Sequence, residues 1–141
     1  MSYLENIEAW FKKVWVDQDL DGIEDSFTHP DAAGGLQGLS LSPEDFRELV
    51  PAMRALFNDP KVTTLRAVET GDWLWMLVQV TGISAQDGRD LSFTGQVAMR
   101  FEGDKIAEAY NHFDFISFFE QIGALPEETI ALCLSGEQLQ P

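Results

Sequence analysis

The sequence contains one cysteine, few basic residues and no long hydrophobic run, and each shortage excludes a class of protein. Cys133 cannot form an internal disulfide, and its place in an apolar run favours a buried structural thiol in a reducing compartment. Only 9 Lys and Arg residues accompany 24 Asp and Glu residues, and the resulting net charge of -15 would repel the phosphates of nucleic acids. We therefore expect no nucleic-acid partner and interpret the acidity as a solvated surface.

Signals for membrane insertion and for bound groups are also lacking. No segment approaches the roughly 20 apolar residues of a membrane span, and no basic region followed by an apolar stretch opens the chain. The two histidines, His29 and His112, are far apart, and no Cys/His ligand spacing, glycine-rich nucleotide loop or GxSxG motif occurs. We expect a cytoplasmic protein with no membrane partner, no metal and no nucleotide cofactor.

What the sequence does contain is enough apolar material for a core. Of its 141 residues, 45% are hydrophobic and 11% aromatic, and a chain of this length can bury roughly two thirds of its unfolded surface. Neither a repeat nor a linker interrupts it. We expect a single domain spanning residues 1–141.

Helical signals occupy the first part of the chain. Ser2 and Glu5 form a capping-box pattern before apolar residues at helical spacing, which predicts a helix over residues 3–16. A shorter helix or turn is expected over 19–27. Residues 29–42 are rich in glycine and favour an irregular loop. Ser42 and Pro43 then begin a second amphipathic helix, predicted to run to about residue 58 and to stop at Pro60.

After Pro60 the pattern changes to strands, expected over residues 62–69, 73–83, 91–101 and 106–113 with short turns between them. Two short helices follow, over 116–122 and from Pro126 to about residue 134. Helices first and an antiparallel meander afterwards is an α+β arrangement, in which the helices cover the apolar face of a curved sheet. Such a cone-shaped sheet leaves a pocket at its open end.

The last predicted strand carries the most promising polar groups. Alternation places five side chains on one face, close enough in pairs to touch one small ligand: Ile106, Glu108, Tyr110, His112 and Asp114. In an apolar pocket, His112 and Asp114 could move a proton. The alternatives are that Asp114 caps the helix beginning near residue 115 and that His112 is an ordinary strand residue, and a β-bulge would undo the register.

The run from Asp114 to Gly123 (DFISFFEQIG) resembles a motif of the SnoaL-like polyketide cyclases, in the nuclear transport factor 2-like superfamily. The preceding GDKIAE segment is similar to that family's turn and strand entry. The resemblance implies a cofactor-free enzyme that cyclises, isomerises or hydrolyses an apolar molecule, with Asp114 as general acid/base and His112 assisting. It also implies a homodimer.

Further pocket residues are predicted from position alone. The expected walls are Trp10, Trp15, Phe57, Trp73 and Trp75, with Gln79, Gln96 and Tyr110 as strand-borne polar contacts. Each tryptophan has core or interface packing as its alternative role. Two other functions stay open for the same fold: a binding protein that holds its ligand without turnover, and a dimerising interaction protein that works through its sheet face.

One competing signal points to calcium. Residues 17–22 match the start of an EF-hand loop, but Thr28 stands where the loop needs a glutamate and Glu24 where it needs an apolar residue. Calcium binding between Asp17 and Asp25 is therefore a minor alternative to an acidic cap on the second helix.

Overall fold

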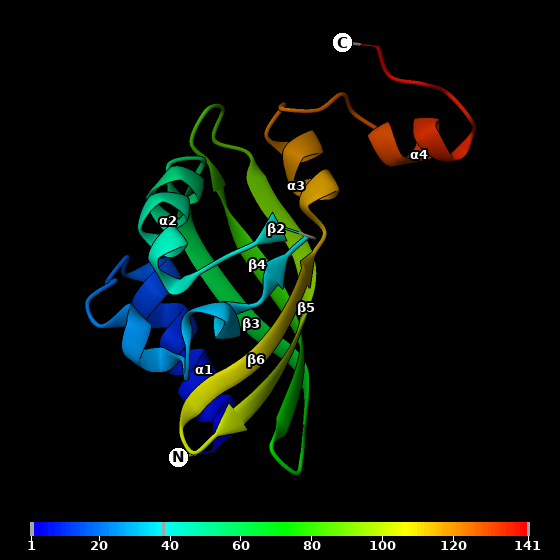
Figure 1. Cartoon of the computed structure of the whole chain (residues 1–141). Coiled ribbons are helices and arrows are strands. Elements are labelled where there is room, and N and C mark those ends of the chain that lie inside the picture. Colours follow the sequence, from blue (N-terminus) through cyan, green and yellow to red (C-terminus); the bar gives the residue numbers. More distant parts are fainter. Residues whose placement is uncertain (1, 38, 141) are drawn as a thin grey trace.

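The structure is a computed structural model that describes residues 2–37 and 39–140. Its elements follow the expected order of helices, long strands and terminal helices (Figure 1). The helical elements are α1 (Tyr3–Phe11), the π-helix η1 (Lys12–Val16), the 3-10 helices η2 (Ile23–Ser26), η3 (Pro30–Ala33) and η4 (Pro43–Asp45), α2 (Phe46–Arg54), α3 (Phe115–Gln121) and α4 (Thr129–Leu134). The strands are β1 (Gly35–Leu36), β2 (Leu39–Ser40), β3 (Phe57–Thr70), β4 (Trp73–Ser84), β5 (Asp90–Glu102) and β6 (Lys105–Phe113).

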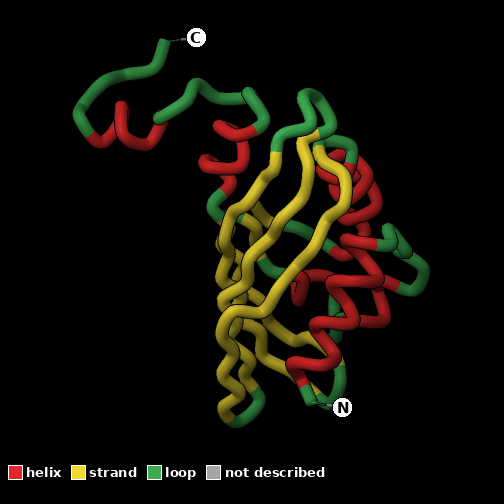
Figure 2. Tube along the Cα trace, turned by 180° about the vertical axis from the view of Figure 1, so that it is seen from behind, coloured by secondary structure: helices red, strands yellow, loops and turns green. Residues whose placement is uncertain are grey.

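The strands form one curved, unclosed sheet in the order β2-β1-β6-β5-β4-β3. The four long strands are the antiparallel meander that the sequence predicts, while β1 pairs in parallel with the end of β6. Helices α1 and α2 cover one face of the sheet, and α4 lies on the other side (Figures 1 and 2). The α+β prediction is therefore confirmed, with a mixed rather than purely antiparallel sheet.

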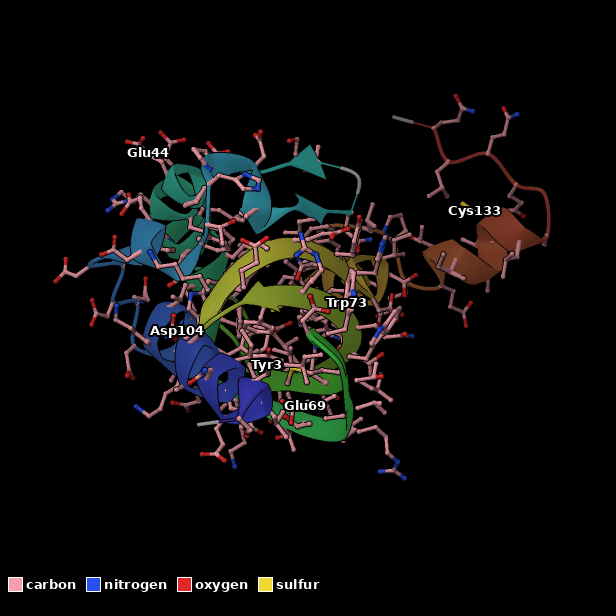
Figure 3. All side chains as sticks on the ribbon, turned by 60° about the horizontal axis from the view of Figure 1, so that its bottom comes forward. Tyr3, Glu44, Glu69, Trp73, Asp104 and Cys133 are labelled. Carbon is pink, nitrogen blue, oxygen red and sulfur yellow. The ribbon has the colours of Figure 1, made fainter. Side chains whose placement is uncertain are left out.

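Helix α1 and η1 together span the 3–16 segment predicted as one helix. Ser2 accepts a hydrogen bond from the backbone N–H of Glu5, as the capping pattern indicates. The N–H of Tyr3 donates to the carboxylate of Glu69 at 2.8 Å, and Figure 3 shows these two residues side by side. The ring of Tyr3 also stacks on Phe101 with centroids 4.3 Å apart. These contacts fasten the start of the helix to the sheet.

Two predicted helical segments are shorter than expected: the helix or turn over residues 19–27, and the amphipathic helix from Pro43 to about residue 58. Residues 19–27 hold only η2, and the 29–42 loop contains η3 and the β1–β2 pair. Helix α2 ends at Arg54 rather than near residue 58, because Phe57 already pairs with Ser84 of β4. Pro60 therefore lies inside β3 instead of stopping a helix. Sheet pairing outweighs local helical periodicity at this point.

The core lies between the helices and the inner face of the sheet. On β4 the buried inner residues Leu74, Met76 and Val78 form one cluster with four residues of the helices: Ile7, Phe11, Val14 and Val50. A second cluster surrounds Phe118 of α3, which is fully buried.

The C-terminal part departs from one expectation. Cys133 is exposed on α4, away from the body of the molecule (Figure 3), so the prediction of a buried structural thiol is wrong. The apolar run around it has little to pack against. Among the described residues, no helix is long and apolar enough to cross a membrane.

Candidate functional site

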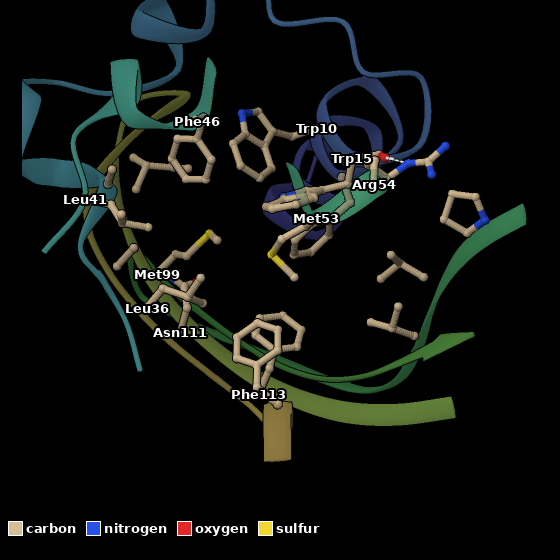
Figure 4. Close-up of a pocket in the computed structure, with 18 of the residues that line it drawn as sticks. Trp10, Trp15, Leu36, Leu41, Phe46, Met53, Arg54, Met99, Asn111 and Phe113 are labelled. Atoms are coloured by element: carbon tan, nitrogen blue, oxygen red, sulfur yellow. Dashed lines mark hydrogen bonds between the residues drawn. The ribbon is translucent and has the colours of Figure 1, made fainter. Parts of the chain in front are cut away.

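An apolar cavity of about 90 Å³ lies between the helices and the concave face of the sheet (Figure 4). A buried water needs only about 10–15 Å³ of such space, so the cavity can hold a ligand larger than a water molecule. Its walls come from both layers. The helical side contributes Trp10, Phe11, Trp15, Phe46 and Met53, and the strands contribute Phe57, Val80, Phe93, Met99 and Phe113.

Few side chains of this lining can form hydrogen bonds. They are the two tryptophans, Arg54 and Asn111. The Nε1–H of Trp10 is buried and has no partner among the described residues. Asn111, on β6, donates through Nδ2 to the carbonyl of Gly35 at 3.1 Å, which leaves its Oδ1 atom and its second Nδ2–H to a ligand. The cavity therefore favours an apolar ligand and offers it very few hydrogen-bond partners.

Arg54 is the one charged residue of the described lining, and it acts as a clamp. Its Nε–H donates to the carbonyl of Trp15 at 2.7 Å and an Nη1–H donates to the carbonyl of Phe57 at 3.0 Å. The guanidinium also lies 5.7 Å from the ring centre of Phe57. In Figure 4 its head group points away from the middle of the cavity, toward the carbonyl of Trp15. Arg54 thus fixes the end of η1 to the start of β3 at the edge of the cavity.

Asp114 lies between two residues of the lining, Phe113 and Phe115, but its own side chain is exposed. The Oδ1 atom accepts a hydrogen bond from the backbone N–H of Ser117 at 3.1 Å, so Asp114 is the N-cap of α3. The helix-capping alternative is confirmed. A catalytic role for Asp114 stays a prediction, since the carboxylate is at the margin of the cavity and not among its walls.

The expectation that His112 faces the apolar pocket is wrong. Arg100 pairs with Glu108 and Phe101 with Ile106, so Ala107 is an extra residue, a β-bulge, and Ile106 is no longer on the same face as Glu108. The cavity side of β6 consists of Ile106, Ala109, Asn111 and Phe113. The opposite, outer side carries Glu108, Tyr110 and His112.

On that outer side His112 borders a shallow polar groove of about 600 Å³ near the β1–β2 pair. The groove also holds the other histidine, His29, together with Asp31, Arg100, Glu108 and Tyr110. The structure thus brings the two histidines to one groove, although they are far apart in sequence. His112 is separated from the apolar cavity by the backbone of β6.

A hydrogen-bonded triad crosses this groove. The Tyr110 hydroxyl donates to Glu108 at 2.6 Å, and the Nε–H of Arg100 donates to the same carboxylate at 3.0 Å. The hydrogen bond from Tyr110, followed by that from Arg100, lowers the pKa of Glu108. The same bond raises the pKa of the Tyr110 hydroxyl, because ionised Tyr110 would face the carboxylate. The charged groups of the triad, Arg100 and Glu108, are thus already paired with each other.

The other predicted lining residues divide by face. Trp10, Trp15 and Phe57 line the cavity, and their contact with a ligand stays a prediction. The expectation that the remaining five line the same pocket is wrong, because they belong to the outer face of the sheet: Trp73, Trp75, Gln79, Gln96 and Tyr110. Strand alternation holds for Trp73 to Gln79, but the inner face of β4 is the aliphatic one. Gln79 donates to Ser92 on that outer side at 2.9 Å.

The segment proposed for calcium does not gather ligands. Asp17 forms an ion pair with Lys12 at 2.8 Å, and Asp19 accepts a hydrogen bond from the backbone N–H of Asp21. Within residues 2–37 and 39–140, no three His, Cys, Asp or Glu side chains are arranged to hold a metal ion. Glu24, in the same segment, forms an ion pair with Arg47 of α2.

With this geometry in place, comparison with known proteins identifies the family. Residues 5–122 match the SnoaL-like polyketide cyclases. The chain belongs to this family. The match begins within α1 and ends after α3, so this SnoaL-like protein has its cavity wholly inside the family domain. No curated protein matches the chain.

Solved structures show the same fold at low sequence identity. TsrD from Streptomyces laurentii is 17% identical with a TM-score of 0.68, covering 87% of this chain and 96% of that one. IdmH, a putative polyketide cyclase from Streptomyces antibioticus, is 20% identical with a TM-score of 0.69, covering 87% and 99%. AclR, a putative hydroxylase from Streptomyces galilaeus, is 19% identical with a TM-score of 0.70, covering 95% and 91%. At these identities the likeness concerns the fold alone.

Sequence reasoning missed Asn111 as the polar group of β6 that faces the cavity. The signal was present: on β6 the alternate set with Ala109 and Phe113 is more apolar than the set with Glu108, Tyr110 and His112. A strand with one buried face turns its more polar set outward. Applied here, that rule places Asn111 inside and His112 outside.

Proposed function

We propose that this protein binds a small, largely apolar organic molecule in the cavity between α1, α2 and the sheet. The lining carries the proposal, because it is largely apolar and Asn111 is the one amide side chain among its described residues. Burial of apolar surface would supply most of the affinity, at about 25 cal/mol per Å². A carbonyl or hydroxyl group on the ligand would form a hydrogen bond with Asn111, and this bond would orient the ligand.

A second candidate function is cofactor-free cyclisation or isomerisation of that ligand. Membership of the SnoaL-like polyketide cyclase family favours it, and so does the place of Asp114 between two lining phenylalanines. In an isomerisation the carboxylate removes a proton from the carbon beside a carbonyl and returns it elsewhere on the enolate. In a cyclisation the enolate carbon instead attacks a second carbonyl of the ligand, and the alkoxide that forms takes the proton back from the carboxylic acid. Asp114 would then serve both as helix cap and as base.

One probe, the small cyclic ketone cyclopentanone, tests both candidates. Binding is measured through the tryptophan fluorescence, to which Trp10 and Trp15 in the lining of the cavity contribute. We expect saturable quenching, and Val80→Phe, which fills the cavity, should weaken it at least tenfold. The matched control is Val68→Phe, the same change at an outer-face residue that is 59% exposed. Equal binding by both variants would contradict the cavity as the site.

The catalytic candidate has its own measurement. In D₂O, proton removal beside the ketone exchanges hydrogen for deuterium, which NMR follows directly. Acceleration by the wild type that is lost in Asp114→Asn would support catalysis, since asparagine keeps the helix cap but cannot take the proton. Saturable binding without acceleration of the exchange would contradict the catalytic candidate and support the binding function only.

A further inference from the structure

Arg54, the last residue of α2, is a half-buried arginine that forms no ion pair within the described part of the chain. In that same part, Arg47, Arg89 and Arg100 each contact at least one carboxylate. Arg66 is also without a carboxylate there, but its side chain is exposed and therefore hydrated. In a chain with 24 Asp and Glu residues, Arg54 thus keeps an uncompensated charge where water hydrates it only in part.

The hydrogen bonds of Arg54 leave some of its donors over. A guanidinium has five N–H donors, and two of them go to the backbone carbonyls of Trp15 and Phe57. The other three, including both on Nη2, have no partner among residues 2–37 and 39–140. Neighbouring acidic residues do not use them there, because Asp17 is engaged in another ion pair and Asp59 is exposed and unpaired with Arg54. These donors are therefore available to an anionic ligand.

The guanidinium lies at the edge of the apolar cavity. Trp15, Phe57 and Pro60 belong to the lining together with Arg54, and the guanidinium carbon is 5.7 Å from the ring centre of Phe57. In Figure 4 the side chain of Arg54 runs along that edge, beside Trp15. Two opposite charges attract more strongly beside apolar groups than in open water. An anion at this edge would therefore bind more tightly than at an exposed arginine.

The amide of the lining lies on the other side of the cavity. Figure 4 shows Asn111 of β6 and Arg54 of α2 on opposite sides of the apolar space. No Asp or Glu is among the described lining residues, and Asp114, at the margin, follows Phe113, which Figure 4 shows on the side away from Arg54. A ligand in the cavity would thus meet a neutral amide at one end and a cation at the other.

We propose that the ligand of this cavity is a small apolar carboxylic acid, whose carboxylate binds the free N–H groups of Arg54 while its apolar body fills the cavity. A carboxylate offers two oxygens to the planar guanidinium, and such charge-assisted hydrogen bonds are stronger than neutral ones. The net charge of -15 repels free anions, so a preference for a carboxylate must come from this local cation. The inference rests on the proposed binding function and names the chemical class of its ligand.

The test compares 3-oxocyclopentanecarboxylate with its neutral carboxamide, through tryptophan fluorescence at pH 7. Both compounds contain the ring of cyclopentanone, and they differ only in the group that carries the charge. We expect the wild type to bind the carboxylate at least tenfold more tightly than the carboxamide. Arg54→Gln should abolish this preference and leave the affinity for the carboxamide nearly unchanged.

Two further variants control for charge and for folding. Lys61→Gln removes the same charge from an exposed residue that follows Pro60 and lies outside the lining, so it should keep the preference. Arg54→Lys keeps the charge without the planar fork, and we expect it to bind the carboxamide normally with a preference between those of the wild type and Arg54→Gln. A preference unchanged in Arg54→Lys would mean that the fork is not used.

The remaining outcomes separate this inference from the proposed function. If neither compound binds and cyclopentanone does not bind either, both are wrong. If cyclopentanone binds but the wild type does not prefer the carboxylate, the cavity takes neutral ligands and only this inference is wrong. A preference that survives in Arg54→Gln, or disappears in Lys61→Gln, would place the anion elsewhere. Acetate has the carboxylate without the ring, and if it bound as tightly, the apolar cavity would not be part of the site.

Discussion

The carboxylate of Asp114 caps α3 by accepting the backbone N–H of Ser117, three residues further on, at 3.1 Å. The residue that the family resemblance singles out for chemistry therefore also has a structural function. A loss of activity on its substitution can come from the missing base or from the missing helix cap. A pair of variants separates these two effects.

We expect Asp114→Ala to lower the free energy of unfolding by about 1 kcal/mol, because the N–H of Ser117 loses its partner, whereas Asp114→Asn should change it little. Urea denaturation measures both. If the alanine variant is as stable as the wild type, the cap contributes nothing and water replaces it.

Gly34 holds the β1–β2 pair against β6, and no other residue fits there. An added Cβ would lie 1.9 Å from the carbonyl oxygen of Ala109, and Gly34 has φ +73°. Gly88 has φ +74° but open space around it, so a substitution there introduces backbone strain without a steric clash. We expect Gly88→Ala to destabilise by about 1 kcal/mol and Gly34→Ala by clearly more. Equal losses in urea denaturation would contradict the close approach.

The triad of Arg100, Glu108 and Tyr110 predicts a pH dependence with a defined sign. Hydrogen bonds from Tyr110 and Arg100 lower the pKa of Glu108 in the folded state, so its contribution is present above the ordinary value of 4.5 and is lost as the pH falls through the lowered one. Thermal melts between pH 2 and pH 7 should therefore show a gap between wild type and Glu108→Gln that closes in acid.

The same triad affects tyrosine ionisation. The carboxylate of Glu108 raises the pKa of Tyr110 above 10.0, so the stabilising contribution of this bond persists below that pH and is lost above the raised value. Ultraviolet titration should show that Glu108→Gln lowers the pKa of Tyr110, with Tyr110→Phe assigning the signal against Tyr3. An unchanged titration would mean that the bond does not persist in solution.

Arg54 clamps η1 to β3 through two backbone carbonyls, and we expect Arg54→Met to destabilise by about 1–3 kcal/mol because both carbonyls lose a charged donor. Arg47→Met is the control, since Arg47 forms an exposed ion pair with Glu24 and should contribute little to stability. Chemical denaturation compares the two. Similar effects would show that Arg54 is no more important than a surface arginine.

Most of the fold was predictable because its signals are local. The strands at 73–83, 91–101 and 106–113 lie within one residue of β4, β5 and β6, where apolar alternation and glycine turns agree. Helix α2 was overestimated because apolar spacing continues past Arg54, while pairing of Phe57 with Ser84 claims those residues for the sheet. A long-range hydrogen bond leaves no trace in local periodicity.

For the site, alternation correctly grouped Glu108, Tyr110 and His112 on one face but assigned that face to the wrong side. On β4 both faces carry large apolar residues, so Trp73 and Trp75 gave no indication of which side is buried. The Ala107 bulge further separated Ile106 from Glu108. Asp114 was identified with both of its roles open, and the cap is the one that the geometry confirms.

The sequence alone determined the family, the order of elements and the grouping of side chains along each strand, because capping residues, turns and periodicity act over a few neighbouring residues. Only the tertiary structure decided which face of the sheet the helices cover. That choice depends on which set of side chains buries more apolar surface against α1 and α2. It placed Asn111 in the lining of the cavity, His112 and His29 in the lining of the outer groove, and Asp114 at the margin of the cavity.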